Sequence, residues 1–257
     1  MLYLKGVVFK YDSSRSGEVA KKFYEGFKGT LITDAYAGYE KVEGIKRALC
    51  WSHLRRYYVE SIPLDSKGNE IAGSKGAEGR EFCDRLFEIE RQISELKPQE
   101  KKVKRHELSI PILKEFWAWV EETKEMYTMN ENLKKALTYT TNQKKYLETF
   151  LEDGRTPISN NDCEGSIRPF AYGRRAWLFA DSQDGATANG VIYTIVETAK
   201  LNGLNVYEYI KYLLEVMPDS EYQINPEILD EYMPWSMTLP AICRSEDNQE
   251  KDIQVAL

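Results

Sequence analysis

Two carboxylates are the residues of this sequence whose types and positions point most directly to chemistry. Asp34 directly follows an apolar run that predicts a short strand, and Glu164 stands near the start of a predicted helix. In α/β sheets, ligands bind outside the carboxyl ends of strands, so an acid in that position is a candidate metal ligand. Carboxylate oxygens suit hard cations such as Mg²⁺, and two such ions can stabilise the attacking and leaving oxygens of a phosphoryl transfer. Asp34 and Glu164 are therefore candidate ligands for that reaction.

Both acids also fit structural roles. An Asp that follows a strand and precedes a glycine-containing turn can accept a hydrogen bond from its own backbone, which describes Asp34 equally well. The spacing from Asn161 to Glu164 is that of a capping box, in which the Glu bonds back to the first amide of the helix. Residue types and spacing leave both roles open.

Basic side chains suited to phosphate binding fall in two clusters that contain no acid. The first holds Lys46, Arg47, Arg55 and Arg56, and the second holds Arg168, Arg174 and Arg175. Arginine can bind a phosphate with two parallel hydrogen bonds, and the neighbouring Trp177 could stack on a base. His53, at the start of a predicted helix, could orient a phosphate or a metal-bound water, although a structural role also explains it. Charge clusters are commonly solvated helix faces, so DNA contact is a hypothesis here.

The net charge of −6 does not exclude a nucleic-acid partner, because the acid is concentrated at one end. Residues 219–257 hold nine Asp or Glu against two Arg or Lys, a balance of 2 − 9 = −7, which leaves +1 for the first 218 residues. Local basic faces matter more for DNA contact than the total charge.

Composition excludes several other classes of protein. The four cysteines form no CxxC pair and only two histidines accompany them, which argues against a zinc site or a disulfide framework. No apolar run approaches the roughly 20 residues of a membrane span, and the N-terminus lacks the features of a signal peptide. A cytoplasmic protein without a membrane partner is expected.

Hydrophobic periodicity predicts alternating strands and helices in the first part of the chain. The expected strands are 7–11, 30–33 and 47–51, and the expected helices are 17–27 and 52–60. This alternation favours an α/β layer with some parallel pairing.

A different pattern follows. Residues 63–79, rich in Gly, Ser and Lys, predict a flexible break, and the next 75 to 80 residues predict about three helices. The charged stretch 97–107 reads as the connection between the first two of these helices. The aromatic stripe of Phe116, Trp117 and Trp119 is expected in the core.

The last part of the chain predicts helices and an acidic tail. A short helix is expected from about Asn161, then an apolar segment at 176–180, and then helices at about 187–202 and 207–216. Loose order is expected beyond Arg244.

Four blocks of this sequence stand out together: GTLITDAYAGYE at 29–40, ALCWSHLRRYY at 48–58, DGRTPISNNDCEGSIRPFAYGRRAWLFADS at 153–182 and IYTIVETAKLNGLNVYEYIKYLL at 192–214. In their order and spacing they resemble the signature blocks of insertion-sequence-66-type transposases. The resemblance covers nearly the whole chain and is weakest in the helical stretch and the tail. The blocks around Asp34 and Glu164 are the most specific.

The resemblance implies an α/β fold with an RNase H-like mixed sheet, as in DDE integrases and transposases, and a large all-helical insertion. The first strand of that sheet is expected to be missing from this sequence. It implies metal-dependent cleavage and transfer of DNA strands, with Asp34 as the second Asp and Glu164 as the Glu of a two-metal Mg²⁺ or Mn²⁺ site. His53 and Asn161 would be auxiliary residues. DNA, both transposon ends and target, would be the partner of a homo-oligomer.

The resemblance also implies an organisation of the chain. Residues 1–62 would form the first part of the RNase H-like core, 63–152 the flexible break and helical insertion, 153–218 the second part of the core with the Glu-bearing helix, and 219–257 the acidic tail.

The sequence departs from the family pattern at its start. In the family, the first catalytic Asp ends a strand upstream of residues 7–11, and Asp12 does not align with it. A two-metal site without one shared ligand is expected to lose most of its activity. An N-terminally truncated transposase, complemented by an upstream fragment or accessory proteins, is one expectation. The alternative is a non-catalytic DNA-binding or assembly fragment, or a remnant of such a transposase.

Overall fold

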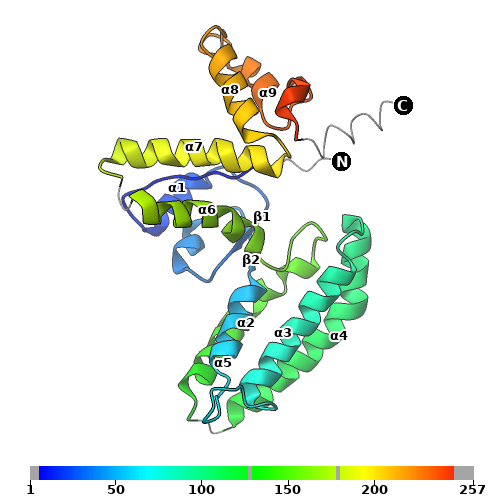
Figure 1. Cartoon of the computed structure of the whole chain (residues 1–257). Helices are drawn as coiled ribbons and strands as arrows, with labels where there is room; N and C mark the ends of the chain where they lie inside the picture. Colours follow the sequence, from blue (N-terminus) through cyan, green and yellow to red (C-terminus); the bar gives the residue numbers. More distant parts are fainter. Residues whose placement is uncertain (1–5, 127–128, 178–179, 246–257) are drawn as a thin grey trace. The chain divides into compact units, whose positions relative to one another are not determined.

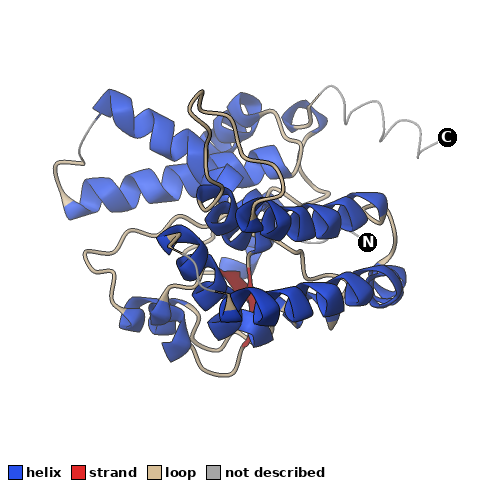
Figure 2. Cartoon of the chain, turned by 90° about the horizontal axis from the view of Figure 1, so that it is seen from below, coloured by secondary structure: helices blue, strands red, loops and turns tan. Residues whose placement is uncertain are grey.

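In a computed structural model, the chain folds as two compact units (Figure 1). The structure describes residues 6–126, 129–177 and 180–245. The sheet unit is Ser14–Asp162, and the C-terminal unit combines Met1–Ser13 with Cys163–Leu257. Helices make up most of the described chain, as the blue ribbons of Figure 2 show, and the fold is mixed α/β.

A two-stranded parallel sheet lies in the sheet unit. Strand β1, Thr30–Thr33, pairs in parallel with β2, Lys46–Leu49, so that Thr33 lies opposite Leu49. The ladder continues past the strands, because the Cys50 amide donates to the Thr33 carbonyl at 3.2 Å. The prediction for residues 30–33 is confirmed. The second strand is shorter than predicted because helix α2 already begins at Trp51.

Two short elements flank the first strand. Helix α1, Gly17–Phe23, packs against the 3₁₀ helix η1, Ala37–Lys41. Gly17 allows this close approach, since a Cβ there would lie 2.9 Å from the Gly38 carbonyl oxygen. Helix α1 ends earlier than its predicted limit at residue 27 because the chain turns at Gly26, whose φ of 77° favours glycine.

Among the described residues, four α-helices and the 3₁₀ helix η2, Thr149–Leu151, follow in the sheet unit. The α-helices are α2 at Trp51–Glu60, α3 at Lys75–Gln92, α4 at Pro98–Glu125 and α5 at Glu131–Leu147. The three helices expected after the predicted break at 63–79 are present, but α3 already begins at Lys75, so the break is shorter than predicted. The charged stretch 97–107 was predicted wrongly as a connection, because nearly all of it belongs to α4. Pro98 occupies the first helical position and Glu100 accepts the Lys97 amide at 3.1 Å, which together start the helix there.

The core of the sheet unit is aromatic. Trp51 and Tyr58 of α2 are fully buried against Phe116 of α4. The core prediction is confirmed for Phe116 and Trp119, which are 0% and 9% exposed, whereas Trp117 is only partly buried. Trp51 also donates its backbone amide to the Ile158 carbonyl at 3.0 Å. This contact ties the segment before residue 161 to the core.

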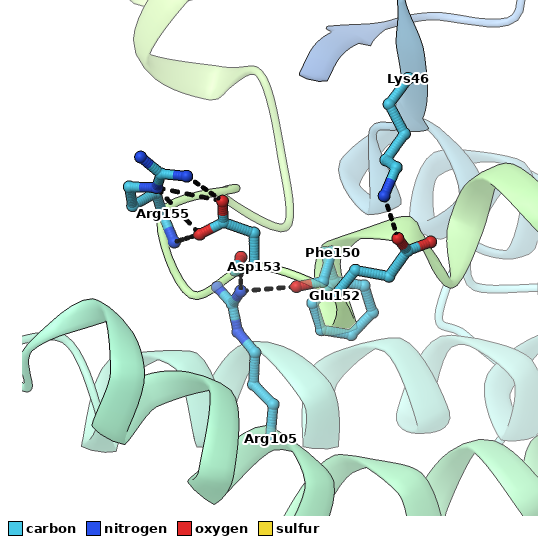
Figure 3. Close-up of polar contacts among 6 residues, drawn as sticks. All are labelled: Lys46, Arg105, Phe150, Glu152, Asp153 and Arg155. Carbon is cyan, nitrogen blue, oxygen red and sulfur yellow. Dashed lines mark hydrogen bonds and ion pairs between the residues drawn. The ribbon is translucent and has the colours of Figure 1, made fainter. Parts of the chain in front are cut away.

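A buried arginine fixes the segment that follows α5. Figure 3 shows the Arg105 guanidinium of α4 between the carbonyls of Phe150 and Asp153, to which Nη1 donates at 2.7 and 3.0 Å. Nε and Nη2 donate to the two carboxylate oxygens of Glu90 at 2.8 and 2.6 Å. Arg155 and Lys46 make the other ion pairs in this view, with Asp153 and Glu152. The chain leading toward residue 161 is therefore held by backbone and side-chain contacts together.

The C-terminal unit is built on helices α6, α7 and α8. Their bounds are Asn161–Trp177, Gln183–Leu201 and Val206–Val216, and the first two residues of α6 belong to the sheet unit. Helix α6 is longer than the short helix predicted, because it continues through Pro169 into the expected apolar segment. Helix α7 ends before Gly203, as predicted, and Gly203 has a φ of 67°. Residues 178–179 of the expected apolar segment lie outside the described residues.

The predicted strand at 7–11 is wrong. The backbone amides of Val7 and Phe9 donate to the hydroxyls of Thr198 and Thr194 on α7, at 3.0 and 2.9 Å, instead of to a neighbouring strand. The Phe9 ring packs against Tyr193 of the same helix, with centroids 5.8 Å apart. Threonine hydroxyls therefore accept the backbone hydrogen bonds of this segment, and aromatic packing holds it against α7, so no neighbouring strand is needed.

The acidic tail contains short helical elements before Arg244. The short 3₁₀ helices η3, Pro226–Ile228, and η4, Ala241–Cys243, accompany helix α9, Leu229–Tyr232. Most of the stretch predicted to be loose, beyond Arg244, lies outside the described residues. In the part of the chain that the structure describes, no helix is both long and apolar enough to cross a lipid bilayer.

Candidate metal and nucleic-acid site

Asp34 is exposed directly after the carboxyl end of β1. Its Oδ1 accepts the backbone amide of Tyr36 at 3.1 Å, which closes the turn expected from the structural alternative. Among the described residues, Oδ2 accepts no hydrogen bond. The turn uses one carboxylate oxygen and leaves the other for a ligand, so the structural and the chemical roles of Asp34 are compatible.

An open cavity of about 720 Å³ borders Asp34 within the sheet unit. The lining residues come from the turn after β1, from α2, from α5 and, in the case of Arg15, from the segment before α1. They are Arg15, Asp34, Ala35, Tyr36, His53, Tyr57, Lys134, Lys135, Thr138, Tyr139, Asn142 and Gln143. Asp34 is the one carboxylate among them, and three of them are cations. The cavity combines a metal-ligand type of side chain with groups that bind anions.

Helix α2 brings His53 to the same cavity as Asp34. His53 and Tyr57 lie four residues apart and so share one face of the helix. His53 was a candidate because it follows a predicted strand, and the structure places it among the residues that line the Asp34 cavity.

The two arginines of α2 do not line this cavity. The Arg55 guanidinium pairs with Asp84 of α3, with Nε to Oδ1 at 2.5 Å, and that hydrogen bond raises the pKa of Arg55. Arg56 is exposed. Of the two, Arg56 is the one whose charge is not engaged by an acid among the described residues.

Helix α5 supplies residues that the sequence analysis did not select. Lys135, Thr138 and Asn142 are exposed along one side of the helix and line the cavity, while Leu137 and Thr140 face the core. The signal in the sequence was a polar face at helical spacing, which any solvated helix shows. Only the fold reveals that this face and Asp34 line the same cavity.

Tyr139 of α5 lies at the inner side of the cavity. Its ring packs on Tyr57, with centroids 4.7 Å apart, and its hydroxyl is buried without a hydrogen-bond partner among the described residues. Burial is the main cause that raises the pKa of Tyr139, the nearby ionisable groups of Tyr57, Cys50 and Asp34 raise it further, and Arg47 lowers it. The phenol therefore keeps its proton at neutral pH.

Glu164 lies on α6 and belongs to the C-terminal unit, whereas Asp34 belongs to the sheet unit. Helix α6 begins at Asn161 itself, so Asn160 takes the position before the helix and Glu164 stands one residue beyond capping-box spacing. Glu164 is half-buried. In the described ranges, no three His, Cys, Asp or Glu side chains gather in a group able to hold a metal ion.

The second basic cluster falls on the same helix. Arg168 and Arg175 are exposed, and the Arg175 guanidinium lies 5.7 Å from the centroid of the Tyr172 ring. The side chains of Arg174 and Trp177 lie outside the described residues. Helix α6 thus presents two of the predicted phosphate-binding cations to solvent.

Comparison with known proteins identifies related sequences over most of the chain. A family model described as Transposase IS66 family matches residues 4–188, a range that contains both Asp34 and Glu164. A second, described as IS66 C-terminal element, matches residues 194–235. No solved structure matches the chain.

Three proteins of Sinorhizobium fredii (strain NBRC 101917 / NGR234) are among the relatives. Uncharacterized protein y4hP is 30% identical over 241 residues, which are 89% of this chain and 43% of that protein. Uncharacterized proteins y4jD and y4qI are each 25% identical, and they match 90% and 92% of this chain with 45% and 44% of their own lengths. This chain therefore spans somewhat less than half the length of these relatives.

Proposed function

This chain belongs to the IS66 family of transposases, and we propose that it serves the metal-dependent cleavage and transfer of DNA strands that moves an insertion sequence. Asp34 and Glu164 are the proposed carboxylate ligands of Mg²⁺ or Mn²⁺, in the two-metal arrangement of DDE enzymes. Transposon ends and target DNA are the proposed substrates.

The observation that carries this proposal is that Asp34 is exposed and that its Oδ2 accepts no hydrogen bond among the described residues. An oxygen donor at the carboxyl end of a parallel strand suits a hard divalent cation, and the bordering cavity leaves room for a phosphate group. A divalent ion bound there would polarise a phosphoryl oxygen and favour ionisation of an attacking water or hydroxyl. The donor chemistry of Asp34 therefore fits the metal that the family implies.

The surrounding residues provide the remaining parts of such a site. His53 lines the same cavity and would orient a phosphate or a water through its imidazole. The exposed guanidinium groups of Arg56, Arg168 and Arg175 would bind DNA phosphates. These assignments make DNA the principal partner, bound by a homo-oligomer as the family implies.

The proposal extends to an RNase H-like core. Parallel strands with an acid after β1, three helices from α3 to α5, and then α6 with Glu164 follow the order of a DDE core that carries a helical insertion. We assign residues 1–62 and 153–218 to that core, 63–152 to the break and insertion, and 219–257 to the acidic tail.

Calorimetric titration of the purified chain with Mn²⁺ tests the assignment. The wild-type chain should bind Mn²⁺, and Asp34→Asn and Glu164→Gln should each remove most of the binding, because each substitution exchanges a carboxylate ligand for a neutral amide. Asp184→Asn, which neutralises an exposed acid on α7, is the matched control and should bind as the wild type does.

Two outcomes would contradict the assignment. Unchanged Mn²⁺ binding by Asp34→Asn would remove that residue from the ligand set. No Mn²⁺ binding by the wild-type chain, together with retained DNA binding, would favour the alternative of a non-catalytic DNA-binding or assembly fragment.

A further inference from the structure

We propose that the exposed face of α5 at the Asp34 cavity binds the phosphodiester backbone of a single DNA strand, with Lys135 as its principal cation. This inference rests on the proposed function and adds to it residues from the helical insertion. In this proposal, α5 holds the strand in the same cavity that Asp34 lines.

The charge of the cavity favours an anionic occupant. Arg15, Lys134 and Lys135 supply three positive charges against the single carboxylate of Asp34. Lys134 already pairs with Glu131 at 2.8 Å, whereas Lys135 and Arg15 make no ion pair among the residues that the structure describes. Within the described chain, these two cations of the cavity therefore have no ion-pair partner, although Glu131, whose pKa is lowered by Lys134 and also by Lys135, lies one helical turn from Lys135.

Lys135 differs in this respect from other lysines of the helices. Lys75 and Lys104 each lie 2.7 Å from a Glu three residues later in the same helix. Such pairs neutralise a solvated face at little cost. An unpaired lysine over a cavity instead remains available to a phosphate group, which it binds as a point charge.

The spacing of the polar side chains on α5 matches an extended strand. Lys135, Thr138 and Asn142 follow each other at three and four residues and line one cavity. At about 1.5 Å per residue, the distance along the helix from Lys135 to Asn142 is on the order of 10 Å. A stacked nucleic-acid strand advances by about 3.4 Å per nucleotide, so this row spans roughly three phosphates.

Cavity size and aromatic lining favour one strand over a duplex. A volume of about 720 Å³ is within the range that holds a ligand of nucleotide size. Two tyrosines, Tyr36 and Tyr57, line the cavity together with these cations, and Tyr36 is 40% exposed. Cationic grooves with aromatic side chains are typical of sites that bind single strands without reading their sequence.

Fluorescence anisotropy tests the inference without requiring catalysis. The full chain is titrated, in EDTA, against a short labelled oligonucleotide of mixed sequence, once as a single strand and once as the duplex. Lys135→Ala removes the proposed contact. Lys144→Ala, on the same helix, is the matched control, because Lys144 is exposed over the Trp117 ring and does not line the cavity.

The two lysine variants should differ. Lys135→Ala should weaken binding of the single strand about fivefold to tenfold and reduce the slope of log K against log salt by about 0.7, the value for one phosphate contact on a single strand. Lys144→Ala should change affinity by less than about twofold. Alanine is a strong helix former, so both variants should keep α5 folded.

Asp34→Asn provides a second readout from the same cavity. Removing its negative charge in the absence of metal should raise the affinity for the single strand by about twofold or more, since the carboxylate repels phosphate. This change is opposite in sign to that of Lys135→Ala, so general damage to the fold cannot produce both results.

The inference fails if Lys135→Ala binds the single strand as tightly as Lys144→Ala does. If Lys135→Ala lost the same amount of affinity for the duplex as for the single strand, the assignment of a single strand as the ligand would be overturned. Because the assay contains no metal, absence of Mn²⁺ binding would sink the proposed catalytic function while leaving the role of Lys135 to be decided by anisotropy alone.

Discussion

Oδ1 of Asp34 accepts a hydrogen bond from the backbone amide of Tyr36 at 3.1 Å. A substitution of Asp34 can therefore change the stability of this turn as well as the proposed metal binding. An alanine at this position would remove both the turn and the proposed metal ligand. An asparagine keeps an oxygen acceptor for the Tyr36 amide while removing the charge.

Stability should therefore separate the two substitutions at Asp34. Asp34→Asn should leave the free energy of unfolding within about 0.5 kcal/mol of the wild-type value, whereas Asp34→Ala should lower it by about 1 kcal/mol through loss of one hydrogen bond. Urea denaturation of the three proteins provides the measurement. If Asp34→Asn is as unstable as Asp34→Ala, the turn depends on the charge and the calorimetric test needs another variant.

The buried Arg105 should be among the most costly residues to truncate. Arg105→Ala should lower the free energy of unfolding by about 3–5 kcal/mol, because it leaves a charged Glu90 whose side chain is only 14% exposed. It also removes the donor to the Phe150 and Asp153 carbonyls shown in Figure 3. Urea denaturation measures the difference.

Arg85→Ala is the matched control for that experiment. The Arg85–Glu115 pair is exposed, at 40% and 57%, so its loss should cost less than about 1 kcal/mol. Adding Glu90→Leu to Arg105→Ala should restore part of the lost stability, since no buried charge remains. Similar costs for Arg105→Ala and Arg85→Ala would show that Arg105 does not hold the segment after α5.

Glu78 should make stability depend on acidic pH. Burial alone raises the pKa of its carboxyl, but hydrogen bonds from Lys75 and from the Trp119 indole, both at 2.7 Å, outweigh burial and lower the pKa from 4.5. A lowered folded-state pKa stabilises the protein above the unfolded value, and that contribution is lost as pH falls through the folded-state pKa.

Glu78→Gln should therefore be less stable than the wild type at neutral pH, and the difference should disappear well below pH 4.5. The carboxylate is about one-third exposed, so the effect should remain below about 1 kcal/mol. Thermal unfolding across this pH range is the measurement. A difference of constant size at every pH would assign the effect to packing and not to charge.

The sequence predicted the elements whose signal is local. Residues 30–33 form the expected strand, and Phe116 lies in the expected core, because an apolar run or stripe has to be buried wherever it folds. The 7–11 segment shows the limit of this reasoning. Its apolar residues resemble a strand, but Thr194 and Thr198, more than 180 residues away, accept its hydrogen bonds on a helix.

The candidate site shows the same limit. Asp34 and His53 were accessible to sequence reasoning because each follows a strand, which is where ligands bind in α/β sheets. Lys135 could not be selected from the sequence, because its sequence neighbours do not indicate that α5 packs near the ends of the two strands. A polar residue on a helix acquires a function only through what lies opposite it, and that information is in the tertiary contacts.

Loss of the hydroxyl should change the stability of the protein in opposite directions at Tyr58, which contacts α5, and at Tyr139, which belongs to α5. The Tyr58 hydroxyl lies 2.8 Å from Thr140 Oγ1 in the core, so Tyr58→Phe should lower the free energy of unfolding by about 0.5–1.5 kcal/mol. The buried Tyr139 hydroxyl has no partner among the described residues. Tyr139→Phe should therefore raise stability by up to about 1 kcal/mol, because an unsatisfied polar group leaves the interior. Denaturation of both variants in urea compares them directly, and a loss for Tyr139→Phe as large as that for Tyr58→Phe would mean that the Tyr139 hydroxyl is hydrogen-bonded in solution.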